Sequence, residues 1–254
     1  MNAPLHTPPP GISAAEWQAR IDLAAAYRLV ARRGWDDLIY THVSARHPEL
    51  ENAFLINRFG LRFAEVTASN LLVIDGEGKV IGDQQYRANP AGFAIHAAVH
   101  RAREDAHCVM HLHTDAGIAV SMLECGLLPV SQHAMRFWKS IGYHDYEGIA
   151  LTPPEAARLV EQLGAHPALI LRNHGTMTVG RTVAEAYVLM DALEKACRTQ
   201  LAAMAASPGG LRLPSEEVLD HTLAQLTGDW EPEGELEWPA LLRMLEREEP
   251  DFLN

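Results

Sequence analysis

The chain has 254 residues, 48% of them hydrophobic, and a formal net charge of -12 from 33 acidic and 21 basic residues. A chain of this length can bury a full hydrophobic core. Its acidic balance, without a long basic patch, argues against nucleic-acid or anionic-membrane surfaces as partners. No apolar run reaches membrane-spanning length, and the three cysteines (Cys108, Cys125 and Cys197) are sparse and lack CxxC spacing. These features predict a cytoplasmic protein with reduced thiols.

The chain divides into three predicted segments. Residues 1–12 hold four prolines and no targeting pattern, so we expect a flexible tail. Residues 13–206 carry closely spaced helix and strand signals without a linker, which predicts one domain. Residues 207–254 predict two amphipathic helices around Trp230 and Trp238. They have few core partners of their own, so we expect an arm that packs on a neighbouring subunit.

Caps and apolar spacing predict the elements of the first half. Ser13-Ala-Ala-Glu16 is a capping box that opens a helix ending at Gly34. Strands are expected at 39–46, 54–57, 71–74 and 79–81. Asn89-Pro90 opens a second helix, which carries His96 and His100 four residues apart on one face. Because nothing else completes a metal site there, we interpret these two histidines as interior residues.

The second half alternates strands and helices at short spacing. Thr114 caps a helix that is expected to end at Gly126. Residues 129–150 are expected to be irregular, and irregular segments often carry functional residues. Thr152-Pro-Pro-Glu155 and Thr182-Val-Ala-Glu185 are two further capping boxes. Apolar strands are expected at 108–113, 168–171 and 176–179. This order predicts a three-layer α/β/α arrangement with a mixed, largely antiparallel central sheet.

Three histidines stand at the ends of two predicted strands. His111 and His113, two residues apart, point to the same face of a strand, and His174 follows the apolar run 168–171. Three neutral imidazoles are a common way to hold a divalent transition metal with one position left open for substrate. Zinc, manganese, cobalt and iron all accept such ligands. The alternative is that each histidine is a hydrogen-bonded interior residue; the pairing on one strand favours the metal.

Several blocks in the same order resemble the class II aldolase/adducin family. They are Ile39-Tyr-Thr-His-Val-Ser-Ala-Arg46, Glu65-Val-Thr-Ala-Ser69, His111-Leu-His-Thr114 and Arg172-Asn-His-Gly175, within a resemblance that runs from about Ser13 to Ala206. The segments Cys125-Gly-Leu-Leu-Pro129 and Tyr143-His-Asp-Tyr146 are similar to the adducin head domain. The resemblance implies a zinc-type ion on His111, His113 and His174, and a homotetramer with its site near a subunit boundary. In the aldolases of this family the ion stabilises an oxyanion while a carbon–carbon bond breaks.

The sequence also departs from the aldolase pattern. A catalytic glutamate of the family falls at Gly92, and glycine can neither bind a metal nor move a proton. Three phosphate-binding elements of the family fall at His42, Phe59-Gly60 and Pro90-Ala91, where only Gly60 is retained. Because the donor groups are lost, a phosphate dianion would lose most of its hydrogen bonds. Glu65 matches a family position but is expected to order the turn before Thr67.

Two functions follow from this combination. The first is a metal-dependent lyase that cleaves or decarboxylates a small, non-phosphorylated hydroxy or keto acid or carbonyl compound. Arg58 or Arg62, beside Gly60, would bind a carboxylate, and His42 would take part in substrate binding. Proton transfer would fall to His42 or to three residues of the irregular segment: His133, Tyr143 and Tyr146. The second is a non-catalytic, adducin-like oligomeric scaffold in which the metal is structural or vestigial.

Overall fold

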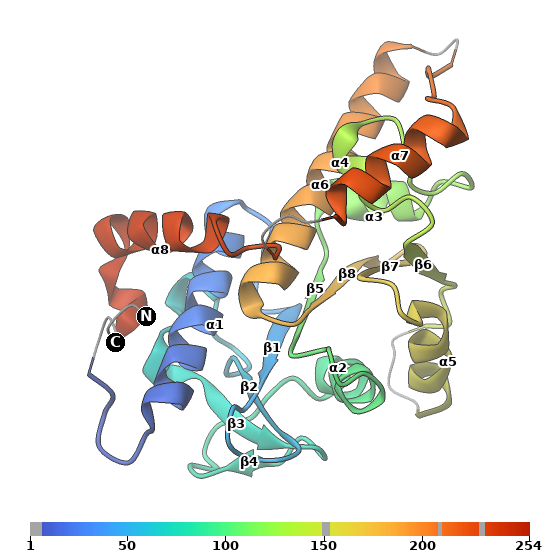
Figure 1. Cartoon of the computed structure of the whole chain (residues 1–254). Helices are drawn as coiled ribbons and strands as arrows, with labels where there is room; N and C mark the ends of the chain where they lie inside the picture. Colours follow the sequence, from blue (N-terminus) through green and yellow to red (C-terminus); the bar gives the residue numbers. More distant parts are fainter. Residues whose placement is uncertain (1–6, 149–152, 208–209, 229–231) are drawn as a thin grey trace.

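A computed structural model describes residues 7–148, 153–207, 210–228 and 232–254, with an eight-stranded sheet at its centre (Figure 1). The strand order is β4-β3-β2-β1-β5-β8-β7-β6, and all neighbouring pairs are antiparallel except β6 and β7. The strands are β1 (His42–Arg46), β2 (Ala53–Ile56), β3 (Leu72–Asp75), β4 (Val80–Ile81), β5 (Cys108–Leu112), β6 (Ile141–His144), β7 (Ala168–Leu171) and β8 (Gly175–Gly180). The mixed, largely antiparallel sheet predicted from the sequence is confirmed.

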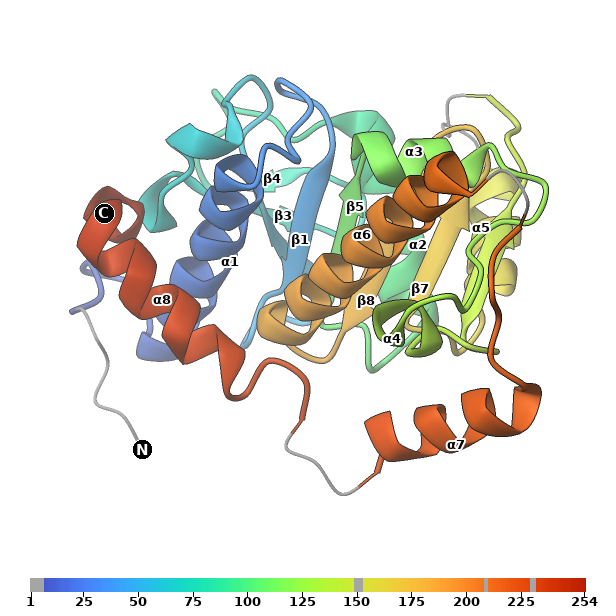
Figure 2. The same ribbon diagram turned by 90° about the horizontal axis from the view of Figure 1, so that it is seen from above.

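Helices cover both faces of this sheet, as Figure 2 shows from above. One face carries α1 (Ala14–Arg32), α3 (Asp115–Ser121) and α6 (Val183–Ala206), and the other carries α2 (Pro90–Ala102) and α5 (Pro153–Leu163). Strand β5 serves both cores, because Met110 and Leu112 pack with α1 and α6 while Val109 packs with α2 and α5. The three-layer arrangement is therefore confirmed, and His111 shares the face of Val109, which looks toward α2.

Three of the predicted helix caps are confirmed. The side chains of Ser13, Thr114 and Thr182 each accept a hydrogen bond from the backbone amide three residues later, at 3.0, 3.1 and 3.0 Å. The capping residue Thr152 lies outside the described residues. Glu65 accepts a hydrogen bond from the Arg62 amide at 2.9 Å, so it orders the turn before Thr67 as expected.

Two predicted boundaries and the predicted character of one segment were wrong. Strand β1 starts at His42 and not at residue 39, because Leu38 and Thr41 adopt left-handed backbone angles (φ 52° and 63°) that a strand cannot contain. The helix after Thr114 ends at Ser121, and a series of turns leads on to Gly126. The segment expected to be irregular contains a short helix, α4 (Gln132–Met135), and the edge strand β6. Strand β6 has only four residues, Ile-Gly-Tyr-His, and shows no apolar run by which the sequence would mark it as a strand.

The C-terminal segment splits into two helices with different surroundings. Helix α8 (Glu237–Glu248) packs on α1 of its own chain, where Leu245 is fully buried and the Trp238 indole donates to Asp22 at 2.8 Å. Helix α7 (Glu216–Leu226) contacts α4 and leaves Val218 half exposed. Helix α8 therefore buries its apolar face against its own chain. Packing on a neighbouring subunit stays a prediction for α7. Trp230 lies outside the described residues. Among the described helices, none joins the length and the apolar character needed to cross a membrane.

The predicted N-terminal tail is described from residue 7 onward. The Ile12 amide donates to the Pro9 carbonyl at 3.2 Å, and the Ile12 side chain packs against the core beside α1. The start of the domain is thus fixed just before the Ser13 cap, and residues 1–6 lie outside the described part of the chain.

Candidate metal centre

The three predicted ligands converge on one point at the end of β5. The Nε2 atoms of His111 and His113 lie 3.1 Å apart, and the ring of His174 is centred 4.8 Å from each of the other two rings. One ligand atom from each histidine can be chosen so that all three lie within 4.8 Å of one another. The spacing of His111 and His113 is that of two imidazoles around one shared ion, with metal–nitrogen distances of about 2.0–2.1 Å, and His174 lies beside them.

Two of the three rings are oriented by hydrogen bonds at their Nδ1 atoms. The His111 Nδ1 donates to the Thr176 carbonyl at 3.0 Å, and the His113 Nδ1 donates to a carboxylate oxygen of Asp37 at 2.9 Å. A carbonyl and an ionised carboxylate only accept, so each ring keeps its proton on Nδ1 and presents the Nε2 lone pair to the shared point. Partners of this kind orient metal-binding histidines and raise their basicity.

Burial keeps the cluster in its ligand form. Burial lowers the pKa of His174 to about 4, helped by the nearby rings of His113 and His144. Burial also holds the pKa of His111 well below its usual range. Neutral imidazoles are the metal-binding form, so the donor set fits a divalent transition ion.

The turn between β7 and β8 delivers the third ligand. Asn173 takes a left-handed conformation (φ 57°), which Asn tolerates better than most residues, and directs the chain into Gly175. A Cβ atom on Gly175 would lie 2.5 Å from the Leu112 carbonyl oxygen. Glycine at this position therefore lets β8 close on β5 and brings His174 beside the other two histidines.

The triad lies at a cavity of about 470 Å³, a usual size for a small-molecule site. The side chains around it are aromatic, aliphatic or uncharged polar. The lining residues are Tyr40, Thr41, His42, Phe59, Asn89, Gly92, Ile95, His111, His113, Ile118, Tyr146, Gly148, Asn173 and His174. Two of the predicted substrate or proton-transfer residues, His42 and Tyr146, are thus brought to the triad.

His42 and Gly92 both line this cavity and are in direct contact with each other. A Cβ atom on Gly92 would lie 1.8 Å from Cε1 of His42 and 2.2 Å from its Nε2. The imidazole therefore occupies the space that a side chain at position 92 would need. Neither ring nitrogen of His42 has a partner with hydrogen-bond geometry among the described residues. Burial lowers the pKa of this histidine to about 4, and the nearby backbone at Gly92 and Thr41 offsets part of that lowering.

A buried chain of polar groups runs behind His42, between β1 and α2. The His100 Nδ1 donates to the Ala106 carbonyl at 2.7 Å, so its Nε2 must accept from the Ser44 hydroxyl at 2.8 Å. Ser44 has one proton, so its oxygen accepts from the Nδ1 of His96 at 2.6 Å. The Nε2 of His96 is left as a buried acceptor, and its ring is centred 4.2 Å from that of His42. The interpretation of His96 and His100 as interior residues agrees with this network.

The structure places the other predicted residues away from the triad. Arg58 stacks on Tyr86, Arg62 lies near Asp36 on the surface, and Gly60 is exposed, so none of these three lines the cavity. His133 is exposed on α4. The Tyr143 hydroxyl accepts from the Leu127 amide at 3.0 Å, which fixes this ring beside the core around α3 and α6.

Sequence reasoning missed Asp37 and Thr41. Asp37 is 76 residues from its partner His113, and only the left-handed turn at residues 38–41 brings it near, for which the sequence carries no glycine signal. The Thr41 hydroxyl is buried at the cavity without a described hydrogen-bond partner. An acidic pair after Gly34-Trp35 is a weak sign, and nothing links it to a histidine by spacing alone.

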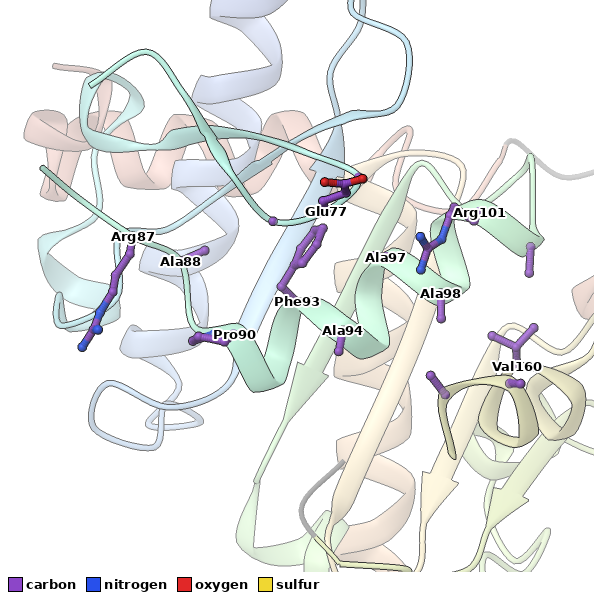
Figure 3. Close-up of a pocket in the computed structure, with 15 residues that line it drawn as sticks. Glu77, Arg87, Ala88, Pro90, Phe93, Ala94, Ala97, Ala98, Arg101 and Val160 are labelled. Carbon is purple, nitrogen blue, oxygen red and sulfur yellow. The ribbon is translucent and has the colours of Figure 1, made fainter. Parts of the chain in front are cut away.

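A second cavity, of about 820 Å³, is larger but carries less chemistry. It lies between α2, α5 and the turn before β4, with alanines, Phe93 and Val160 along its walls and Glu77, Arg87 and Arg101 at its edges (Figure 3). No group of three metal-ligating side chains gathers there within the described residues. The smaller cavity, where the triad lies, is therefore the candidate site.

Comparisons with known proteins agree with this architecture. The family described as "Class II Aldolase and Adducin N-terminal domain" matches residues 21–201. An aldolase II superfamily protein from Pseudomonas syringae superposes with a TM-score of 0.92 and 46% identity, over 96% of this chain and 98% of that one. An L-fuculose 1-phosphate aldolase from Glaciozyma antarctica superposes with a TM-score of 0.84 and 30% identity, over 98% and 97% of the two chains. Alpha-adducin from Rattus norvegicus is 42% identical over 193 residues, 75% of this chain and 26% of the adducin. The chain therefore belongs to the class II aldolase and adducin family.

Proposed function

We propose that this protein is a metal-dependent lyase that cleaves or decarboxylates a small, non-phosphorylated hydroxy or keto compound. The observation that carries the proposal is the convergence of His111, His113 and His174 at a cavity, with two of the rings locked so that Nε2 faces inward. A three-histidine site with an open position is typical of catalytic metals, whereas structural zinc sites are usually closed by four protein ligands.

The residues of the chain divide the work around such an ion. The three histidines would hold it, and Asp37 and the Thr176 carbonyl would orient two of them. A bound divalent ion, zinc in our proposal, supplies Lewis-acid polarisation of a carbonyl oxygen. His42 and Tyr146 are the proton-transfer candidates that line the cavity, and Tyr146 is 56% exposed at its mouth. His133 and Tyr143 do not line it, which weakens their case.

The substrate is proposed to lack a phosphate group. The three family positions for phosphate binding are occupied by His42, Phe59-Gly60 and Pro90-Ala91, and no Lys or Arg lines the pocket among its described residues. The similarity to an L-fuculose 1-phosphate aldolase therefore supports the metal chemistry more than the substrate.

The first test is elemental analysis of the purified protein and its His174→Ala variant, with oligomer size measured by light scattering. We expect one transition ion per chain in the native protein, its loss in the variant, and an unchanged homotetramer in both. A panel of hydroxy and keto compounds should then show turnover that disappears with the ion. A fully metal-loaded protein that turns over none of them would contradict the proposal.

The second candidate function is a non-catalytic, adducin-like oligomeric scaffold. For both functions we propose a cytoplasmic location. It is favoured by the 42% identity to alpha-adducin and by glycine at position 92. In this case the His174→Ala protein would keep its assembly and its partner binding, and no compound in the panel would react. Metal-dependent turnover by the native protein would exclude it.

A further inference from the structure

The metal pocket has no cationic side chain among the described residues that line it. Its walls are formed instead by three aromatic rings, Tyr40, Phe59 and Tyr146, and by Ile95 and Ile118. Among the described residues of one chain, the lining therefore supplies no positive charge other than that of a bound ion.

The arginines near Phe59 and Asn173 in the chain have other contacts, and Arg172 stacks on the ring of Tyr143. The guanidinium of Arg58 lies 3.7 Å above the ring of Tyr86, and that of Arg62 lies 3.5 Å from Asp36 with the side chain 61% exposed. Arg87 approaches the ring of Phe59 at 5.7 Å but lines the larger cavity and extends away from α2 (Figure 3). None of these arginine side chains lines the metal pocket.

On the basis of the proposed metal-dependent function, we infer that the substrate has two metal-chelating oxygens at one end and an uncharged, apolar or aromatic body at the other. The apolar walls reward burial of such a body. A carboxylate or phosphate at that end would lose its water without gaining a partner, which is strongly unfavourable. The polar side chains of the lining are uncharged, and two of them, the Thr41 hydroxyl and the His42 ring, are buried without a described partner. They suit a neutral hydroxyl or carbonyl.

Hydroxamates test this inference because their two oxygens chelate a metal while the rest of the molecule can be varied. The Co²⁺-loaded protein would be titrated with acetohydroxamate, benzohydroxamate and succinic acid monohydroxamate, and binding followed in the visible spectrum of the cobalt. We expect benzohydroxamate to bind at least about tenfold more tightly than acetohydroxamate, because a phenyl group buries more apolar area. The anionic succinic derivative should bind no better than acetohydroxamate. Tighter binding of the anionic probe would overturn the inference and would point to a cation supplied by a neighbouring subunit.

Two variants locate the effect in the pocket wall. Phe59→Ala should remove most of the preference for benzohydroxamate, whereas Tyr86→Ala, next to the pocket but not lining it, should leave the preference intact. Phe59→Lys should reverse the order and favour the anionic probe. An unchanged order in Phe59→Lys would contradict the proposed placement of the substrate body against this ring.

A measurement without metal separates this inference from the proposed function. Saturation-transfer NMR on the metal-free protein would compare benzyl alcohol with phenyl phosphate. Signal for the alcohol alone, absent in Phe59→Lys, would support the uncharged body even if no cobalt spectrum were obtained. Failure to bind cobalt would count against the metal-dependent function, and preference for phenyl phosphate would count against the substrate class.

Discussion

Position 92 and position 42 share one volume in this protein. An imidazole at 42 reaches within 2.2 Å of any Cβ at 92, and the ring is confined by the neighbouring rings of His96 and His111. With the His42 ring in this position, residue 92 has room for glycine alone. The position that the family resemblance gives to a catalytic glutamate has been replaced by space for a histidine from another strand.

This shared volume predicts a strong coupling between the two positions. Gly92→Glu should lower the free energy of unfolding by about 2–3 kcal/mol, because the added side chain overpacks a buried site. His42→Ala/Gly92→Glu should recover most of that loss, since the shorter residue at 42 vacates the space. Urea denaturation of both singles and the double variant measures the coupling. Additive effects in that cycle would contradict the steric account.

Asp37 is a second position where one side chain governs the site. Asp37→Ala should weaken metal binding by about 10–100-fold, because His113 loses the acceptor that orients its ring. Competition with a coloured chelator gives the affinity. Asp36→Ala is the matched control, since Asp36 lies on the same turn but is within reach of Arg62 instead. Equal losses in the two variants would assign the effect to the turn and not to the carboxylate.

At the scale of elements, the packing of α2 on β1 depends on uncharged histidines. Burial, followed by the charges of Arg46 and His107, lowers the pKa of His100 to about 3, and burial holds that of His96 well below its usual range. The unfolded chain has ordinary histidines with a pKa of about 6.5, so below this pH it binds protons that the folded chain excludes. These two histidines therefore leave the unfolding free energy undiminished above about pH 6.5, and they lower it progressively as the pH drops toward 3.

The pH dependence can be assigned to one residue. Between about pH 6.5 and 5, above the carboxylate range, each such histidine contributes up to about 1.4 kcal/mol per pH unit to the slope of stability. His100→Gln should reduce the slope of the unfolding free energy by about that amount, whatever its effect at neutral pH. His133→Gln, at an exposed position on α4, should leave the slope unchanged. Guanidinium titrations at several pH values supply the measurement.

Elements with a local signal were predictable, and contacts across the sheet were not. The caps at Ser13, Thr114 and Thr182 and the alternation through β5 depend on residues a few positions apart, so the sequence alone reveals them. The convergence of His174 with His111 depends on strand order, yet both residues could be recognised because each ends an apolar run. The Ser44–His96–His100 network could not, since tautomers and partners arise only when β1 and α2 meet.

At the scale of the whole molecule, the C-terminal segment closes the α1 side of the core. Trp238 and Phe252 are buried there, and Arg28 pairs with Asp251 at 2.6 Å across more than two hundred residues of chain. Residues after the family-matched region, which ends at 201, are thus part of the folding unit of this chain. Helix α7, by contrast, contacts the rest of the chain through α4. The contributions of α7 and α8 to folding stability can therefore be measured separately.

Two tryptophans report on these two helices. Trp238→Ala should cost about 3 kcal/mol of folding stability, because it removes a large buried ring from between α8 and the core. Trp138→Ala removes a hydrogen bond to Asp220 on α7 and should cost less than about 1.5 kcal/mol. Urea midpoints and oligomer size would be recorded together. A loss of assembly in Trp138→Ala alone would support the expected contact of α7 with a neighbouring subunit.

The facing pair at positions 42 and 92 also constrains the history of the site. If an ancestor carried the aldolase glutamate at 92, a histidine entering at 42 would have collided with that side chain in the ring position seen here. Replacement of the glutamate by glycine before the ring entered is the order that avoids this clash. On that order the lineage passed through proteins with neither group in place, so a proton-transfer group here would have been rebuilt and not carried through unbroken.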